Sequence, residues 1–195
     1  MIKRILTIFF LFTLSLLISC SNSKPSSQVQ ACFTPGENCT ATVVQAIETA
    51  KESIFIQANG FNNPIITKAM LDAKRRGVDI RVIFDKTLQT QANSPAISLY
   101  QYGIPVWLDN KVEAAGNNVM IVDNAQVFTG SFNFTEEAQN KNAENLLIIE
   151  EPAIVKRYID NWQSRVVVSQ AMAEALKTAE NKTAIPTQAA KTKSN

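Results

Sequence analysis

Histidine is absent from this chain of 195 residues, and cysteine occurs only three times. Without histidine, a serine or threonine nucleophile lacks its usual general base. Zinc centres usually take four nitrogen or sulfur ligands. Three cysteines without a histidine therefore make a poor ligand set for zinc. The sequence therefore predicts no zinc centre, no histidine-based catalysis and no bound cofactor.

The chain also lacks a meaningful excess of positive charge. Its 19 basic and 17 acidic residues give a net charge of +2, and loss of Lys3 and Arg4 with the first 19 residues would leave 17 of each sign. Nucleic-acid affinity comes largely from lysine and arginine that neutralise phosphates. A protein without net charge could neutralise phosphates only through a local cluster of basic residues such as 74–76, Lys-Arg-Arg. That cluster could equally be the solvated end of a helix.

The N-terminus has the pattern of an export signal. Lys3 and Arg4 precede an apolar run at 5–18, which falls short of the roughly 20 apolar residues that a membrane span needs. The sequence Leu-Ile-Ser-Cys that ends at Cys20 resembles a bacterial lipobox. We predict a signal peptide at 1–19, lipidation of Cys20 and a lipid-anchored protein of the cell envelope, at the outer membrane or periplasmic face.

Composition divides the rest of the chain into three parts. Residues 20–28 hold the expected lipidated cysteine and a serine-rich linker, and residues 29–180 are long enough for one domain with one core. Residues 181–195 are rich in alanine, threonine and lysine and are expected to be disordered. No internal repeat is present, so each chain carries one copy of any site.

The two remaining cysteines are close in sequence. Cys32 and Cys39 flank a Pro-Gly pair that could return the chain and bring the sulfurs together. In an exported protein a disulfide is the expected state, and a metal site is the competing interpretation.

Strand and helix patterns alternate along 29–180, which is typical of α/β layering. Strand patterns occur at 29–33, 53–58, 78–84, 105–108, 118–122, 126–129 and 143–149, and helical patterns at 40–51, 64–76, 94–102 and 152–180. Asn63 is a suitable N-cap and Pro64 a suitable first helical residue, while Gly77 is a suitable stop. We predict an α/β fold with a mixed central sheet flanked by helices.

The most informative segment is 116–134, Gly-Asn-Asn-Val-Met-Ile-Val-Asp-Asn-Ala-Gln-Val-Phe-Thr-Gly-Ser-Phe-Asn-Phe. Its spacing resembles the phospholipase D superfamily motif His-x-Lys-x4-Asp-x6-Gly-Ser-x-Asn. Asp123, Ser131 and Asn133 match the motif, but Gly116 stands at the histidine position and Asn118 at the lysine position. Side chains two residues apart on an extended segment point to the same side, so the intact pair would stand together.

The resemblance extends beyond the motif to the bacterial periplasmic endonuclease branch of that superfamily. It covers the segments 31–39, 75–80, 103–106, 130–135 and 142–149 in the same order, within about 29–170. This resemblance implies an αβα sandwich and no metal. It also implies that Glu144 matches an acidic residue of the family's site and that Asp123 supports the site.

In the family, the motif histidine attacks phosphorus, a second histidine protonates the leaving alcohol, and the lysine and asparagine bind the phosphate oxygens. In a chain with one motif, the second histidine comes from a twofold partner, so the resemblance implies a homodimer. The substitutions at 116 and 118 remove the nucleophile, the general acid and both lysines from such a dimer.

Two functions follow as hypotheses. The first is a catalytically impaired, membrane-anchored protein that binds a phosphate ligand or a protein through Ser131, Asn133 and Glu144, or that pairs with an active relative. The second is a residual phosphodiesterase acting on nucleic acid or phospholipid, in which Asp123 and Glu144 hold a metal with a third ligand from Asp109 or Glu113.

Overall fold

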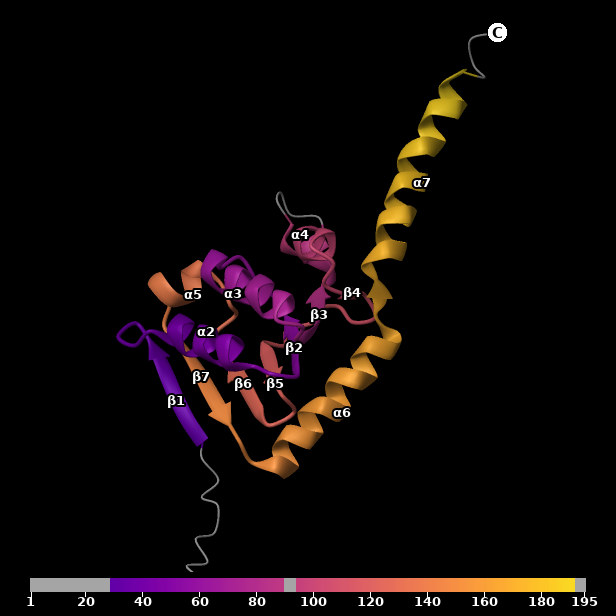
Figure 1. Ribbon diagram of the computed structural model, residues 1–195. Helices are drawn as coiled ribbons and strands as arrows, with labels where there is room; N and C mark the ends of the chain where they lie inside the picture. Colours follow the sequence, from indigo (N-terminus) through magenta and orange to yellow (C-terminus); the bar gives the residue numbers. More distant parts are fainter. Residues whose placement is uncertain (1–28, 90–93, 192–195) are drawn as a thin grey trace, which may run out of the picture.

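The structure, a computed structural model, describes residues 29–89 and 94–191 (Figure 1). The predicted signal peptide, Cys20 and the linker at 20–28 lie outside the described residues. Among the described helices, none combines the length and the apolar character that a membrane crossing requires.

One eight-stranded mixed sheet forms the centre of the fold, in the order β1-β7-β6-β5-β2-β3-β4-β8. The strands are β1 Val29–Thr34, β2 Ser53–Ala58, β3 Asp79–Asp85, β4 Val106–Asp109, β5 Val119–Val122, β6 Gln126–Gly130, β7 Glu144–Ile149 and β8 Gln170–Ala171. β2, β3 and β4 are parallel to one another, and every other pairing is antiparallel. The predicted mixed sheet is confirmed.

Helices cover both faces of this sheet (Figure 1). They are α2 Cys39–Thr49, α3 Pro64–Arg75, α4 Pro95–Gln101, α5 Glu136–Asn140, α6 Pro152–Val168 and α7 Met172–Lys191, with a 3-10 turn η2 at Lys86–Gln89. The larger apolar core joins one face of the sheet to α2, α3, α4 and the start of α7. A smaller core joins the other face to α6.

Local sequence chemistry accounts for several helix starts. Asn63 accepts hydrogen bonds from the backbone N–H groups of Ile65 and Ile66, and Pro64 follows it as the first residue of α3. Ser94 caps α4 in the same way, again with a proline next in the chain. These caps confirm the helix starts that the sequence predicts at both positions.

The C-terminal region departs from the prediction of one helix over 152–180. α6 ends at Val168, β8 pairs with the free edge of β4, and α7 then begins at Met172. Three consecutive valines end α6, and β-branched residues are weaker helix formers. The hydroxyl of Ser169 donates to the carbonyl of Arg165 at 2.7 Å, which closes the last turn.

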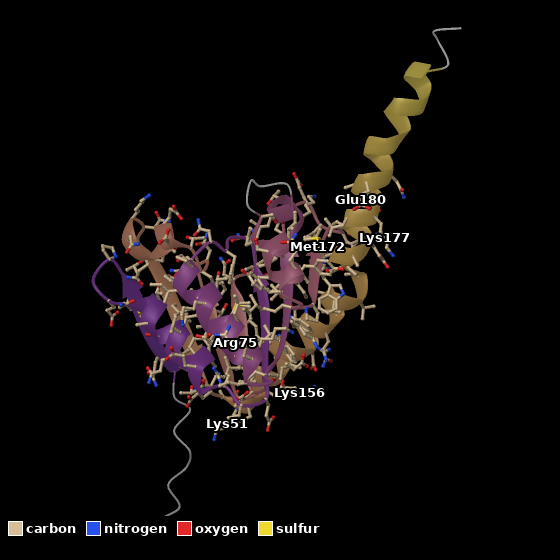
Figure 2. The ribbon with its side chains drawn as sticks, turned by 45° about the horizontal axis from the view of Figure 1, so that its top comes forward. Lys51, Arg75, Lys156, Met172, Lys177 and Glu180 are labelled. Atoms are coloured by element: carbon tan, nitrogen blue, oxygen red, sulfur yellow. A yellow bond between two sulfur atoms is a disulfide. The ribbon has the colours of Figure 1, made fainter. Side chains whose placement is uncertain are left out.

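α7 also reaches Lys191, inside the stretch predicted to be disordered from 181. Alanine, lysine and glutamine within 181–191 favour a helix, but Pro186 disfavours one, so propensity alone does not account for the difference. Met172 is buried against the body, whereas Lys177 and Glu180 lie on the part of the helix that extends away from it (Figure 2).

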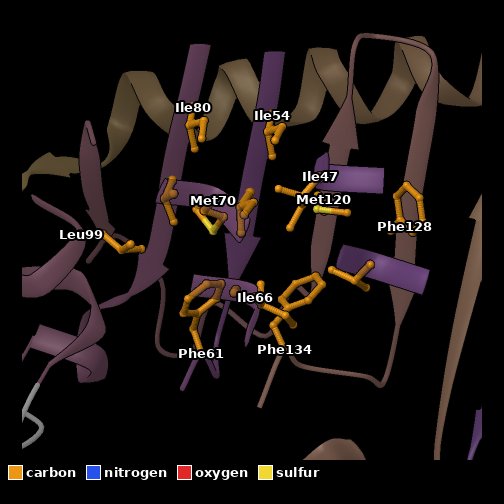
Figure 3. Packing of buried hydrophobic residues seen from close by; sticks show 14 of the residues in the cluster. Ile47, Ile54, Phe61, Ile66, Met70, Ile80, Leu99, Met120, Phe128 and Phe134 are labelled. Atoms are coloured by element: carbon orange, nitrogen blue, oxygen red, sulfur yellow. The ribbon is translucent and has the colours of Figure 1, made fainter. Parts of the chain in front are cut away.

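Aromatic residues fill the centre of the larger core (Figure 3). The ring of Phe61 lies 5.5 Å from that of Phe84 and 6.4 Å from that of Phe134, measured between centroids. On the other face, Trp162 of α6 stacks on Phe55 at 4.7 Å, and its indole N–H donates to a backbone carbonyl of β2. These contacts fix α6 and the loop before α3 on the sheet.

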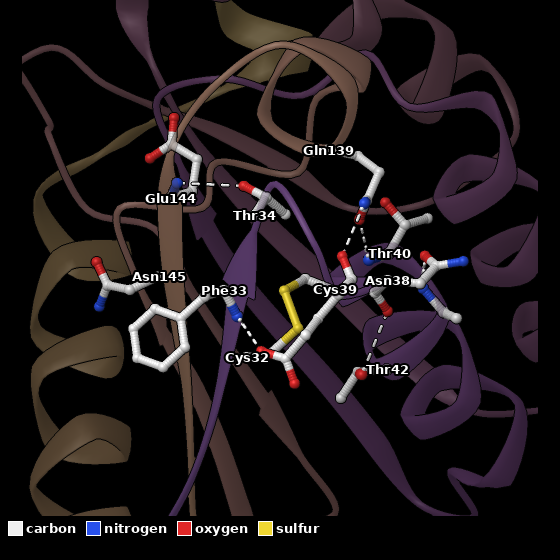
Figure 4. Close-up of a disulfide and its surroundings, with 12 residues drawn as sticks. Cys32, Phe33, Thr34, Asn38, Cys39, Thr40, Thr42, Gln139, Glu144 and Asn145 are labelled. Carbon is white, nitrogen blue, oxygen red and sulfur yellow. Dashed lines mark hydrogen bonds between the residues drawn. A yellow bond between two sulfur atoms is a disulfide. The ribbon is translucent and has the colours of Figure 1, made fainter.

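The predicted disulfide between Cys32 and Cys39 is present, with the two Cα atoms 5.7 Å apart (Figure 4). It joins the end of β1 to the first residue of α2. The Glu37 carboxylate accepts from the backbone N–H of Phe33 at 2.7 Å inside the closed loop. Because both sulfurs are bonded to each other, the competing metal interpretation is not supported.

Candidate functional site

Five strands begin or end along the same side of the sheet, at a boundary made of strand ends and not of an outermost strand. The register pairs Thr34 with Glu144, Leu146 with Gly130, and Val119 with both Thr129 and Gln57. The ends of β1, β2 and β6 therefore lie beside the starts of β5 and β7. Gly116, Asn118, Ser131, Asn133 and Glu144 all belong to this edge, which we call the site edge.

Gly116 and Asn118 lie on the segment that enters β5. Gly116 is exposed, and a Cβ atom built on it would meet nothing within 4 Å. Asn118 is 9% exposed, and its Oδ1 lies 3.5 Å from the backbone N–H of Asn59, at the outer limit of a hydrogen bond. The site edge therefore has free space for a side chain at position 116 and a neutral amide at position 118.

Ser131 is held in place by the neighbouring strand. Its hydroxyl donates to the Oδ1 atom of Asn145 and accepts from the backbone N–H of the same residue, both at 3.0 Å. Gly130 permits this close approach, because a Cβ there would lie 2.2 Å from the carbonyl oxygen of Asn145. The Gly-Ser pair of the motif thus locks β6 onto β7.

Asn133 lies between a turn and a glycine. Its Oδ1 accepts from the hydroxyl of Thr135 at 2.8 Å. A Cβ on Gly60 would be 2.6 Å from its Nδ2, so the side-chain amide packs directly on the loop after β2. The amide is therefore fixed in orientation while its Nδ2 group lies against that loop.

Glu144 stands at the start of β7 and is half-buried. Its backbone N–H donates to the hydroxyl of Thr34 at 3.1 Å (Figure 4), and its Oε1 accepts from the side-chain amide of Asn142 at 3.0 Å. The carboxylate thus lies at the site edge, beside the end of β1.

Asp123 lies at the opposite end of the strands, directly after β5. β5 separates it from Asn118 by ~16 Å at about 3.3 Å per residue, and it accepts from the backbone N–H groups of Lys51, Glu52 and Ser53 at 2.8 to 2.9 Å. Burial alone would raise its pKa, but the three N–H donors outweigh burial and lower the pKa. The structure therefore does not bring Asp123 to the other motif residues; it fixes the start of β2.

Asp85 is a site residue that the sequence pattern did not single out. It is 5% exposed, and its carboxylate accepts from the backbone N–H of Ala115 at 2.7 Å and from the N–H and hydroxyl of Thr87 at 2.8 and 2.6 Å. Burial raises its pKa, and these hydrogen bonds outweigh that effect and lower it. Lys86 donates to the carbonyl of Val112 at 2.9 Å. Together they hold the loop that carries positions 116 and 118.

The described residues do not form the carboxylate metal site of the second hypothesis. No group of three or more acidic, cysteine or histidine side chains suited to a metal occurs in that part of the chain. Asp123 lies far from Glu144, and Asp109 is buried in an ion pair with Arg165, whose Nε donates at 2.8 Å. This pair raises the pKa of Arg165.

The side chains of the basic cluster at 74–76 all contact other groups of the chain at its surface. Lys74 Nζ donates to the carbonyl of Gly103 at 2.7 Å, and Arg76 donates to the carbonyl of Ile47 at 2.8 Å. Arg75 pairs with Asp72. The segments that build the site edge, 58–63, 114–119, 129–135 and 144–145, contain no lysine or arginine. Within these four segments, the acidic side chain of Glu144 is the one charged group.

Comparison with known proteins places this geometry in a family. Residues 43–166 match the family model described as the PLD-like domain of cardiolipin synthase. The chain belongs to the phospholipase D superfamily.

Relatives and solved structures of the superfamily agree with the fold. A phospholipase D of Rickettsia prowazekii is 42% identical over 146 residues, which cover 75% of this chain and 71% of the relative. The crystal structure of Nuc, a phospholipase D family member from Salmonella typhimurium, matches with a TM-score of 0.68 and 37% identity, covering 74% of this chain and 97% of Nuc. NucT from Helicobacter pylori has the same fold, with a TM-score of 0.68 at 22% identity, covering 74% of this chain and 99% of NucT.

Proposed function

We propose that this chain is a catalytically impaired phospholipase D superfamily protein that binds a phosphodiester ligand without cleaving it. Gly116 and Asn118 carry the proposal, because they stand where the family's motif has its nucleophile and its phosphate-binding lysine. In hydrolases where it has been measured, loss of a nucleophile alone reduces turnover by about 10^6-fold. Asn118 can donate a hydrogen bond but supplies no charge.

The surrounding frame supports retained binding. Ser131 and Asn133 hold fixed positions through Asn145, Gly60 and Thr135, so the polar groups of the edge are preorganised although the reactive ones are missing. Neutral donors bind phosphate oxygens more weakly than a lysine does. We therefore expect weak binding of a phosphodiester, in a homodimer anchored to the cell envelope through Cys20.

A residual phosphodiesterase is the alternative, favoured by the name phospholipase D that the Rickettsia relative carries. Its substrate would be nucleic acid or phospholipid. The geometry gives this alternative no paired site from Asp123 and Glu144, since these two carboxylates lie at opposite ends of the strands.

The test compares turnover of bis(p-nitrophenyl) phosphate and nicking of plasmid DNA by the lipid-free chain from Ser21 onward and by its Gly116→His, Asn118→Lys variant. The free space at position 116 accepts the added imidazole. A control variant, Ala114→His, Asn117→Lys, places the same side chains at two exposed neighbours.

We expect cleavage by the restored variant and none by the native chain or the control. Cleavage by the native chain would refute the impaired-enzyme proposal. If the restored variant folds but cleaves neither substrate, then residues beyond positions 116 and 118 are also missing from an active site.

A further inference from the structure

Asn59 and Gly60 form the one Asn-Gly pair in the chain, and they lie at the site edge. β2 ends at Ala58, and the pair leads from it into the loop before α3. The Asn59 side chain is exposed. An asparagine before a glycine can cyclise onto the next backbone nitrogen, because glycine has no Cβ to hinder the approach and readily reaches the backbone conformations that ring closure needs.

Both groups that would react are free in the fold. Within the part of the chain that the structure describes, no hydrogen bond engages the backbone N–H of Gly60 or the side-chain amide of Asn59. The backbone N–H of Asn59 has only its long contact of 3.5 Å with Oδ1 of Asn118. Ring closure therefore requires no local unfolding that breaks a strong hydrogen bond.

Other asparagines at the site edge are held. Asn62 accepts from a backbone N–H at 2.9 Å with its Oδ1 and donates to a carboxylate at 3.0 Å with its Nδ2. Asn63 is followed by a proline, which has no backbone N–H to react. The Oδ1 of Asn145 accepts from the hydroxyl of Ser131 at 3.0 Å. The structure thus distinguishes Asn59 from these neighbours.

The reaction closes a ring and releases ammonia. The backbone nitrogen of Gly60 attacks Cγ of Asn59, and the new C–N bond forms a succinimide. The side-chain nitrogen of Asn59 leaves as ammonia and takes the proton of the Gly60 N–H. Water then opens the ring at either carbonyl and gives aspartate or isoaspartate. Water is the only co-reactant that the balance requires.

Both products would alter the site edge. Glu144 is the one charged group in the four segments that build the edge, so the new carboxylate adds a second negative charge. Isoaspartate also inserts a methylene into the main chain before Gly60. A Cβ on Gly60 would already be 2.6 Å from Nδ2 of Asn133, so the insertion would displace the loop from that amide.

We propose that Asn59 deamidates spontaneously and that its product weakens anion binding at the site edge. The added charge stands beside the segment that carries positions 116 and 118, where it repels phosphate oxygens. The modification is independent of the proposed function, whereas its effect on binding rests on that function. The capacity to bind a phosphodiester thus falls with the age of the molecule.

Incubation of the full-length chain in detergent at 37 °C and mildly alkaline pH, followed by peptide mapping with mass spectrometry, measures the reaction. Asn117 is the internal control, because it is exposed at the same edge but precedes an asparagine. We expect conversion at Asn59 to be at least about tenfold faster than at Asn117. The folded chain should also convert within about tenfold of the rate in urea, because no strong hydrogen bond protects the pair.

The variant Asn59→Gln keeps an amide but would have to close a larger ring, so it should stay unmodified at this position. Equal rates at Asn59 and Asn117 would overturn the assignment of the site. A folded chain that stays intact while the unfolded chain converts would overturn it as well.

The effect on the site edge is measured by comparing fresh and aged chains, with aged Asn59→Gln as the control. The side-chain NMR signal of Asn133 reports on the edge without a ligand, and titration with bis(p-nitrophenyl) phosphate reports on binding. We expect a shifted signal and at least about threefold weaker binding at low salt after conversion, and neither change in the control.

An unchanged Asn133 signal with unchanged binding after full conversion would overturn the claimed effect. If the fresh chain binds no phosphodiester, the proposed function fails. The conversion rate and the Asn133 signal would then still decide this inference, because neither depends on a ligand.

Discussion

Removing the carboxylate of Asp85 should loosen the loop that carries positions 116 and 118. In Asp85→Ala the backbone N–H of Ala115 loses its acceptor, and so do the N–H and hydroxyl of Thr87. Ala115 is 5% exposed, so water does not easily replace the lost partner. The loop would keep the contact between Lys86 and the carbonyl of Val112.

The size of the effect follows from these contacts. A buried donor left without a partner costs about 1–3 kcal/mol, and hydrogen bonds to a charged group are stronger than neutral ones. Thr87 lies nearer to solvent and should recover part of its loss. We therefore expect Asp85→Ala to lower the free energy of unfolding by about 2–4 kcal/mol at neutral pH.

Urea unfolding at pH 7, followed by circular dichroism, measures this loss. Glu113→Ala is the matched control, because it removes an exposed carboxylate from the same loop. In the Gly116→His, Asn118→Lys background, Asp85→Ala should also reduce turnover, whereas Glu113→Ala should not. A loss below about 0.5 kcal/mol, or equal losses in the two variants, would refute the assigned role of Asp85.

Three further outcomes are expected. The lowered pKa of Asp123 means that its contribution to stability is present above about pH 4 and is lost as pH falls from there through the folded-state pKa. Asp123→Asn should therefore be less stable than the native chain at pH 7. Urea unfolding at a series of pH values should show this deficit shrinking toward pH 3. Gly60→Ala places a methyl group 2.6 Å from the Asn133 amide and should cost about 1–3 kcal/mol, with a shifted Asn133 side-chain NMR signal; an unshifted signal would contradict the packing. Cys32→Ser opens a loop with a sequence separation of 7 and should cost about 2.5 kcal/mol in thermal unfolding, a loss that reduction of the native chain should match.

The sequence predicted the elements whose signals are local. Asn63 with Pro64 marks a helix start by cap chemistry, and apolar runs between turn residues mark the buried strands. The motif spacing predicted that positions 116, 118, 131 and 133 share a site, and in the structure they lie on the segments just before β5 and just after β6. The structure places all four at one edge.

Features that depend on distant pairing were not predictable in this way. The division of the C-terminal helix depends on a free edge of β4, more than sixty residues earlier in the chain, that accepts β8. The importance of Asp85 depends on Ala115, 30 residues away. The one local sign was an acidic residue at the end of an apolar strand, Val82-Ile83-Phe84-Asp85.

The locking of Ser131 onto Asn145 has a consequence for how easily chemistry can be lost or regained in this fold. The contacts that hold β6 onto β7 are made by Ser131 and Asn145, and a Cβ atom built on Gly116 would meet nothing within 4 Å. A mutation at position 116 should therefore carry little stability penalty, in contrast to the usual trade-off between activity and stability, whereas position 118 is buried. The residue at position 116, where the family's motif has its nucleophile, can therefore be lost or regained in this fold while the contacts between β6 and β7 stay intact.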